Sequence, residues 1–190
     1  MNLVLDAYYS AYQQRLWQLR QSAYLNYPQL VHLESQALCP AACSFCAYPV
    51  LRRKGTRMDD ALVDKIMTDL EDIPKSIPFN LIPFKVSEPF MEPRLMSMLK
   101  RANERLPNAQ LSLHTSAAPL TEAKLLALNE LQNFHHLAIS VHDPRPEVYT
   151  RLMQLPWERT WERLQMVHRH KAAGRLNFPV HLARVGDGTP

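Results

Sequence analysis

The feature that most constrains the fold of this chain is a regular alternation between short apolar runs and segments with helical periodicity. The runs have the length and apolar content of strands, and the segments between them repeat apolar residues every three or four positions. Such alternation is typical of parallel α/β domains, in which helices connect neighbouring strands and cover the sheet. The predicted strands are residues 30–33, 79–86, 110–114, 137–141 and 180–185.

Start and stop signals accompany the helical segments. Pro93 suits the first turn of one helix, Thr121 is a candidate N-cap for the next, and Gly174 is placed to close the last. Another helix is predicted to begin near Asp59. The predicted apolar faces are Leu62, Ile66, Leu70 and Ile73; Leu95, Met98, Leu99 and Ala102; Leu125, Leu128 and Leu131; and Trp157, Trp161, Leu164 and Val167.

The N-terminal segment precedes this alternation. Residues 3–25 have apolar side chains at helical spacing, and Pro28 follows just beyond them. We therefore expect residues 1–28 to form an N-terminal helical extension and residues 29–190 to form one α/β domain. With 190 residues and 46% hydrophobic composition, the chain can bury a core without disulfides.

Composition excludes several classes of protein. Charged residues make up 21% of the chain, the mean hydropathy is −0.28, and no apolar run approaches the roughly 20 residues of a membrane span. Asp6 and the polar residues at 13–21 interrupt any signal-peptide core, so we expect a cytoplasmic protein with reduced thiols. A net charge of +4 makes a nucleic-acid partner unlikely on these grounds. Four glycines are too few and too scattered for a dinucleotide fingerprint or a P-loop.

The chemical signal is the segment Cys39-Pro-Ala-Ala-Cys43-Ser-Phe-Cys46, which holds all three cysteines of the chain and follows the first predicted strand. Three thiolates on one loop can bind one metal centre, and soft sulfur ligands select iron–sulfur clusters, zinc or copper(I). Structural zinc usually has four protein ligands, whereas a three-thiolate cluster leaves one iron open. A zinc site and three buried structural cysteines remain alternatives at this point.

The spacing Cys-x3-Cys-x2-Cys, with Phe45 before the last cysteine, resembles the signature of the radical S-adenosylmethionine (radical SAM) superfamily. The resemblance implies an open, partial TIM-like barrel of about five parallel βα units. It also implies that Cys39, Cys43 and Cys46 are the catalytic ligands of a 4Fe-4S cluster. Phe45 would border the adenine of the cofactor S-adenosylmethionine.

A second match follows the second predicted strand. The segment 86–89, Val-Ser-Glu-Pro, stands where the family usually has Gly-Gly-Glu-Pro. Glu88 matches the carboxylate that receives the amino group of the cofactor, and Ser87 belongs to the backbone segment beside it. Val86 and Ser87 replace both glycines, which predicts a differently shaped approach of the backbone to the cofactor.

Two further matches follow the third and fourth strands. Thr115 and Ser116 resemble the Thr-Asn-Gly turn of the family, with serine in the place of asparagine. Ser140 and His142 resemble the Ser-Leu-Asp end of the fourth strand, and Arg151 occupies the place of an arginine often found nearby. The resemblance thus covers roughly residues 29–185 and implies that these side chains contact the cofactor at the carboxyl ends of the strands.

The function implied by the resemblance is reductive cleavage of S-adenosylmethionine to a 5'-deoxyadenosyl radical, which abstracts hydrogen from a substrate. The substrate is unknown, and a peptide or another small molecule is the preferred class. An electron donor such as flavodoxin or ferredoxin would reduce the cluster. The alternative is a non-catalytic protein with an electron-transfer cluster or a structural zinc.

The number of predicted strands bears on completeness. Five strands can be identified where the family core generally has six, and the chain has no second cysteine cluster. We therefore expect a core truncated after the fifth strand, which a partner chain or a further segment would complete. An edge strand of a barrel needs such a cover.

Overall fold

The computed structural model describes residues 3–185 and contains one parallel sheet of five strands in the order β1-β2-β3-β4-β5. All four neighbouring strand pairs are parallel. The α/β class and the open, parallel arrangement predicted from the sequence are confirmed. The strands are β1 (Leu30–His32), β2 (Phe79–Ile82), β3 (Ala109–Thr115), β4 (Phe134–Ser140) and β5 (Val180–Ala183).

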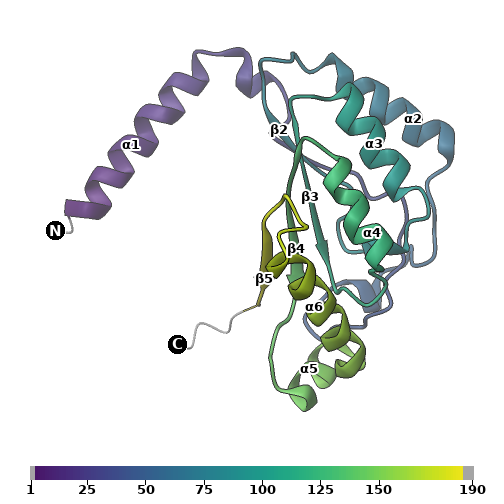
Figure 1. Cartoon of the computed structure of the whole chain (residues 1–190). Helices are drawn as coiled ribbons and strands as arrows, with labels where there is room; N and C mark the ends of the chain where they lie inside the picture. Colours follow the sequence, from purple (N-terminus) through teal and green to yellow (C-terminus); the bar gives the residue numbers. More distant parts are fainter. Residues whose placement is uncertain (1–2, 186–190) are drawn as a thin grey trace.

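Helices connect successive strands and lie on one side of the sheet (Figure 1). Most of their buried side chains and the strand residues that face them form one continuous hydrophobic core. The helices are α1 (Leu3–Arg20), α2 (Asp60–Asp69), α3 (Leu95–Arg105), α4 (Glu122–Ala127), α5 (Pro146–Met153) and α6 (Trp157–Ala172). Short 3-10 helices are η1 (Ala23–Asn26), η2 (Tyr48–Val50), η3 (Leu70–Asp72), η4 (Pro89–Met91) and η5 (Leu128–Glu130).

The predicted helix boundaries are confirmed in three places. Asp59 caps α2, because its Oδ1 accepts a hydrogen bond from the Leu62 amide at 2.7 Å. Thr121 caps α4 through the Lys124 amide at 3.3 Å. Gly174 follows α6 with φ +67°, a left-handed conformation that glycine adopts at little cost.

Several boundaries differ from the prediction. The strand predicted at residues 79–86 ends at Ile82, because Pro83 has no amide hydrogen to continue the ladder. The strand predicted at 180–185 ends at Ala183. The helix predicted at residues 3–25 ends at Arg20 and is followed by η1.

Two helices also differ in detail. On α2 the buried side chains are Val63 and Met67, whereas the predicted core residue Leu62 is 43% exposed. On α6, Trp161 is 48% exposed although we predicted it for the core. Helix α5 was not predicted, because its eight residues are too few to show a clear period.

The two faces of the sheet differ sharply. The face toward the helices carries fully buried residues such as Leu111, Leu113, Leu137 and Ile139. On the opposite, inner face, polar side chains alternate with these, and over the described residues no helix covers them (Figure 1). This exposed inner face is the concave side that a complete barrel would enclose.

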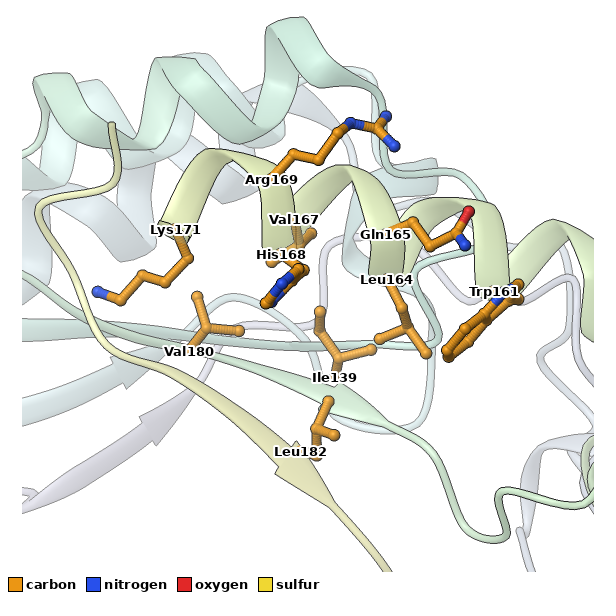
Figure 2. A pocket seen from close by; sticks show the side chains of 10 residues that line it. All are labelled: Ile139, Trp161, Leu164, Gln165, Val167, His168, Arg169, Lys171, Val180 and Leu182. Atoms are coloured by element: carbon orange, nitrogen blue, oxygen red, sulfur yellow. The ribbon is translucent and has the colours of Figure 1, made fainter. Parts of the chain in front are cut away.

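The far edge of the sheet is open on the helix side as well. A groove of about 750 Å³ lies between α6 and the last two strands, lined by apolar residues such as Leu164 and Val180 (Figure 2). Leu182 on β5 is 67% exposed beside it. That a partner chain or further segment covers this edge stays a prediction. No helix within residues 3–185 has the length and hydropathy to cross a membrane.

Candidate functional site

The three cysteines lie on the long connection between β1 and α2. They are free and partly buried. The base of this loop is closed where Gln36 pairs with Arg57 in an isolated antiparallel bridge. Beside it, Ala37 donates to Thr56 and accepts from Gly55, at 2.9 and 2.8 Å. Backbone pairing therefore fixes both ends of the cysteine loop.

Helix α5 holds the middle of the same loop. The amide of Ala42 donates to the Met153 carbonyl at 3.3 Å, and the amide of Ser44 donates to the Leu152 carbonyl at 3.0 Å. The Cys43 Sγ lies 3.5 Å from the Met153 Sδ. A small second core that includes Tyr149 and Met153 lies against Cys39 and Cys43. The unpredicted helix is thus the support of the cysteine motif.

The chemistry of the thiols suits a cluster. Burial raises the pKa of Cys39 to about 12, and the neighbouring charges of Glu88, Cys43 and Cys46 add to that rise. Burial also raises the pKa of Cys43. Three thiolates this close together need positive charge to stay ionised, which iron ions supply. Within residues 3–185 no group of three or more His, Cys, Asp or Glu side chains is arranged to hold a metal ion.

Glu88 joins the cysteine loop to the ends of β2 and β3. Its amide donates to the Leu38 carbonyl at 2.8 Å. Its Oε1 accepts from the Thr115 hydroxyl at 2.6 Å and the Phe90 amide at 3.3 Å. Its Oε2 accepts from the Ser116 amide and hydroxyl at 2.8 and 2.7 Å. All four acceptor positions of the carboxylate are therefore occupied.

The charge of Glu88 nevertheless has no counter-charge. The residue is 2% exposed, and no basic side chain within the described residues forms an ion pair with it. Burial raises its pKa, and the four hydrogen bonds oppose that rise only in part. A cation placed beside this carboxylate would gain a charge-assisted interaction in a dry environment.

The segment where the family usually has two glycines is held by an acid that the sequence analysis missed. Glu34 Oε1 accepts from the amides of Val86 and Ser87 at 2.6 and 2.8 Å, and its Oε2 pairs with Arg53. These amides are therefore already engaged within the protein. Glu34 and Val86 lie 52 positions apart in the sequence, and no spacing signal could have revealed this contact.

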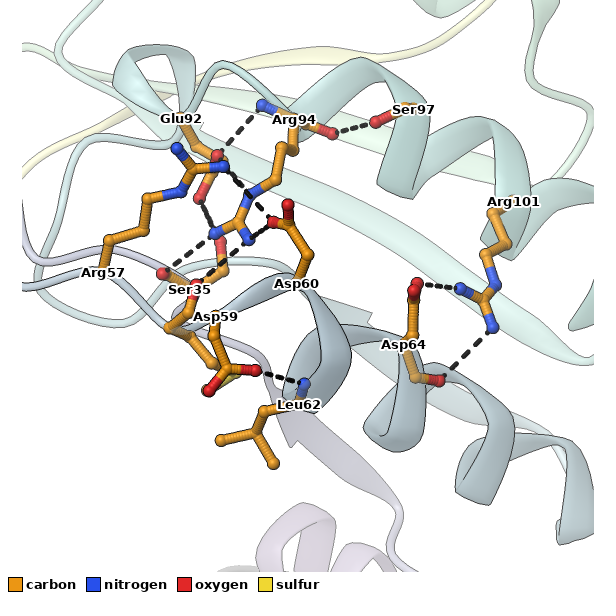
Figure 3. A network of polar contacts seen from close by, with 11 residues as sticks. Ser35, Arg57, Asp59, Asp60, Leu62, Asp64, Glu92, Arg94, Ser97 and Arg101 are labelled. Atoms are coloured by element: carbon orange, nitrogen blue, oxygen red, sulfur yellow. Dashed lines mark hydrogen bonds and ion pairs between the residues drawn. The ribbon is translucent and has the colours of Figure 1, made fainter.

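A second carboxylate, four residues beyond Glu88, lies in a different environment (Figure 3). Glu92 binds Arg94 through two bonds of 2.9 Å and accepts the Ser35 hydroxyl. Arg94 also donates to the Met58 carbonyl at 3.1 Å and pairs with Asp60. Burial would raise the pKa of Glu92, but these hydrogen bonds outweigh it and bring the pKa to about 2. This network fastens the start of the cysteine loop to α2 and α3.

A hollow of about 330 Å³ opens beside the cysteine loop, at the carboxyl end of β4. The Phe45 and His142 rings meet in it edge to face, with centroids 4.5 Å apart. The His142 Nδ1 accepts the Val185 amide at 2.9 Å, which orients the ring. Arg151 and Arg184 also line the hollow. An aromatic wall with cationic groups around it suits a nucleoside that carries a charged substituent.

The predicted site residues separate into those that the structure brings together and those that it does not. Ser87 is buried, and its amide is turned to Glu34. Ser140 is half-buried at the end of β4 and does not line the hollow. The residues gathered around the loop and the hollow are Cys39, Cys43, Cys46, Phe45, Glu88, Thr115, Ser116, His142 and Arg151.

Comparison with protein families supports one assignment. The profile of the radical SAM superfamily matches residues 33–182 of this chain. Those residues contain the cysteine loop, the four other segments that carry predicted site residues, and most of the sheet. A search of curated proteins found no match.

Solved structures with the same fold include three enzymes crystallised with ligands. BtrN in complex with AdoMet and 2-DOIA has 20% identity and a TM-score of 0.56, over 82% of this chain and 57% of that chain. SuiB of Streptococcus suis bound to the precursor peptide SuiA has 13% identity and a TM-score of 0.65, over 94% and 37%. The enzyme anSMEcpe with AdoMet and Cp18Cys peptide has 16% identity and a TM-score of 0.59, over 81% and 42%. At these identities the likeness establishes the fold, and this chain spans between 37% and 57% of their lengths.

Proposed function

Because the chain belongs to the radical SAM superfamily, an enzyme class, we propose that Cys39, Cys43 and Cys46 bind a 4Fe-4S cluster that cleaves S-adenosylmethionine. When bound, these cofactors supply one-electron chemistry: an electron from the cluster breaks the sulfonium carbon–sulfur bond, giving methionine and a 5'-deoxyadenosyl radical that takes a substrate hydrogen. We assign this role to residues 29–190, with residues 1–28 as an extension.

The observation that carries the proposal is the buried, uncompensated carboxylate of Glu88 beside the cysteine loop. An ammonium group such as that of S-adenosylmethionine supplies the missing charge. The longest hydrogen bond to the Glu88 carboxylate, from the Phe90 amide at 3.3 Å, is the easiest for the ammonium group to replace. Thr115 and Ser116 keep the Glu88 carboxylate in position while the ammonium group binds.

The remaining cofactor contacts follow from the hollow beside Phe45. Phe45 and His142 form its aromatic wall and would border the adenine, and Arg151 would face the polar groups of the cofactor. We propose that Ser87 and Ser140 contribute less to cofactor binding, since neither residue lines this hollow. The main task of these residues is to orient one labile bond and to exclude water.

The proposed reaction also requires an electron donor, a reducing compartment and a substrate. The cluster needs an electron donor, for which flavodoxin or ferredoxin has suitable chemistry. Three free thiols that must stay reduced suit the cytosol. The substrate is a peptide or another small molecule.

Anaerobic reconstitution with iron and sulfide tests the proposal. We expect about four irons per chain and, with S-adenosylmethionine and a strong reductant, formation of 5'-deoxyadenosine. Cys43→Ala should abolish both. Ser44→Ala is the matched control, because it alters the neighbouring exposed side chain and keeps the amide bond to Leu152. One bound zinc and no iron in the purified chain would overturn the proposal.

A further inference from the structure

A row of aromatic rings crosses the inner face of the sheet, with four rings on β1, β3, β4 and β5 and one ring just after β2. The ring centroids of His32 and Phe84 are 6.5 Å apart, and those of Phe84 and His114 are 5.7 Å apart. His136 continues the row at 5.6 Å from His114, and His181 ends it at 5.3 Å from His136. Four of the five rings are imidazoles. We call these five residues the imidazole row.

Strand register places the row on the open face. In a parallel sheet paired residues point to the same side, and His136 pairs with Ser112 while His114 and His181 both pair with Ala138. The intervening positions, such as Leu113 and Leu137, face the core. Along these five strands no Asp, Glu, Lys or Arg stands at an inner-face position, so the imidazoles are the titratable groups of this face.

Hydrogen bonds engage the Nδ1 atoms of two of the imidazoles. His32 Nδ1 lies 2.9 Å from the Phe84 carbonyl, which only accepts, so Nδ1 carries the hydrogen and Nε2 is left for a ligand. His136 Nδ1 lies 3.2 Å from the Ser112 hydroxyl, which again leaves Nε2. The rings are inclined to one another by 41° to 88°, so the row presents polar edges and not a flat stacking surface.

The charges around the row favour an anion. Three acids near the carboxyl ends of the strands are already committed, since Glu34 pairs with Arg53, Asp143 pairs with Arg145, and Glu88 is buried. Two cations there form no ion pair among residues 3–185. They are Lys85, just after β2, and Arg184, just after β5.

We propose that the imidazole row is a substrate-binding surface that receives an anionic group, a carboxylate or a phosphate, of the molecule that reacts. This inference names the substrate class of the reaction proposed above and rests on it. The anion accepts hydrogen bonds from imidazoles that become protonated as it binds. The surrounding cations attract it to the open face.

The electrostatics of the row agree with this assignment. Burial lowers the pKa of His114 and of His136, and the charge of neighbouring histidines lowers both further: His32 acts on His114, while His114, His135 and His181 act on His136. Without an anion the row therefore resists a second proton. A bound carboxylate or phosphate removes that repulsion, so anion binding and proton uptake are coupled.

The experiment measures the pKa of each imidazole by NMR in the full chain after anaerobic reconstitution with iron and sulfide. Phosphate and citrate are added in separate titrations, each against sodium chloride at equal ionic strength. We expect either or both to raise the pKa of His114 and His136 saturably, by roughly half a unit to one unit. His168 on α6, which lines the groove on the other side of the sheet, should not respond (Figure 2).

Variants separate the row from general charge effects. The double variant His114→Gln, His136→Gln should weaken the responding anion at least about tenfold, whereas His168→Gln should leave its affinity unchanged. A response to phosphate alone identifies a phosphorylated ligand, and a response to citrate alone identifies a carboxylate. Equal shifts in chloride, equal shifts at His168, or binding of Zn²⁺ but of neither anion would each overturn the inference. Anion binding by a chain that takes up no iron would defeat the proposed reaction and leave the row as a binding site.

Discussion

Two buried glutamates four residues apart, Glu88 and Glu92, lie in different electrostatic environments. Glu92 is 4% exposed and is neutralised by Arg94, so its pKa falls to about 2. Glu88 is 2% exposed and receives hydrogen bonds only from neutral groups, so burial raises its pKa. The first carboxylate completes an internal ion pair, and the second lacks one.

The difference assigns a task to each region. A buried ion pair whose partners satisfy each other holds loops together and needs no ligand. A buried carboxylate that has donors but no counter-charge is prepared for a cation from outside. The Glu92 region therefore stabilises the start of the cysteine loop, and the Glu88 region is the side on which the cofactor is proposed to bind.

The largest expected effect is the loss of stability when the ion pair between Glu92 and Arg94 is removed. Arg94→Met leaves the charge of Glu92 buried and unpaired, and we expect the free energy of unfolding to fall by about 3–5 kcal/mol at pH 7. Urea denaturation measures it. Arg101→Met removes a more exposed ion pair with Asp64 and should cost less than about 1 kcal/mol. Similar losses in both variants would show that the Glu92 pair has no special role.

The next effect concerns the cofactor. Glu88→Gln keeps the size of the side chain and removes its charge, so we expect iron content to be intact and the affinity for S-adenosylmethionine to fall. The loss of a charge-assisted contact should cost about 1.5–3 kcal/mol. Glu92→Gln is the matched control and should leave the affinity of the folded fraction unchanged. Equilibrium binding with an undiminished affinity in Glu88→Gln would remove Glu88 from the cofactor site.

Opposite pH dependences provide a third comparison, in the chain without cofactor. Ionised Glu92 stabilises the fold above its ordinary pKa of 4.5, and this contribution is lost as the pH falls toward about 2. For Glu88 the folded pKa is raised, so stability is lost as the pH rises from 4.5 through that raised value. In urea titrations between pH 3 and 7, Glu92→Gln should therefore reduce the loss at acid pH, and Glu88→Gln the loss toward neutral pH. Parallel pH profiles for the two variants would contradict the assignment.

The smallest expected effect concerns one neutral donor. Thr115→Val removes the 2.6 Å hydrogen bond to Glu88 and the acceptor of the Ala117 amide, which should cost about 1–2 kcal/mol of stability. The variant should also raise the pKa of Glu88 further, because a bond to its ionised form is lost. Thr68→Val, on the exposed surface of α2, should change stability by less than about 0.5 kcal/mol. No difference between the two threonine variants would mean that Glu88 does not depend on this donor.

Much of the fold could be predicted because periodicity is a local property of the sequence. All five strands were found, with boundaries that shifted where Pro83 ended a ladder or where pairing stopped at Ala183. The missed helix α5 is short, and its importance comes from its carbonyls, which accept the amides of Ala42 and Ser44. Contacts made by backbone groups do not depend on side-chain identity, so the sequence pattern could not indicate them.

The candidate site divides in the same way. The cysteine spacing and the Glu88 segment are contiguous motifs, so the sequence could indicate them together with the chemistry of their donors. The partners of the motif lie far along the chain, as with Glu34 and Val86, which are 52 positions apart. The imidazole row is a stronger case, because its members come from four strands and the connection after β2 and share no spacing.

What the sequence by itself determined is the set of local interactions: the strand and helix segments, the caps at Asp59 and Thr121, and three thiols close enough to act together. Only the tertiary structure decided which of two nearby glutamates has a counter-charge, and which face of the sheet gathers the imidazoles. Burial and charge pairing depend on which distant segments meet. The contacts between distant segments follow from strand order and register, which place the carboxyl ends of the parallel strands along one edge of the sheet.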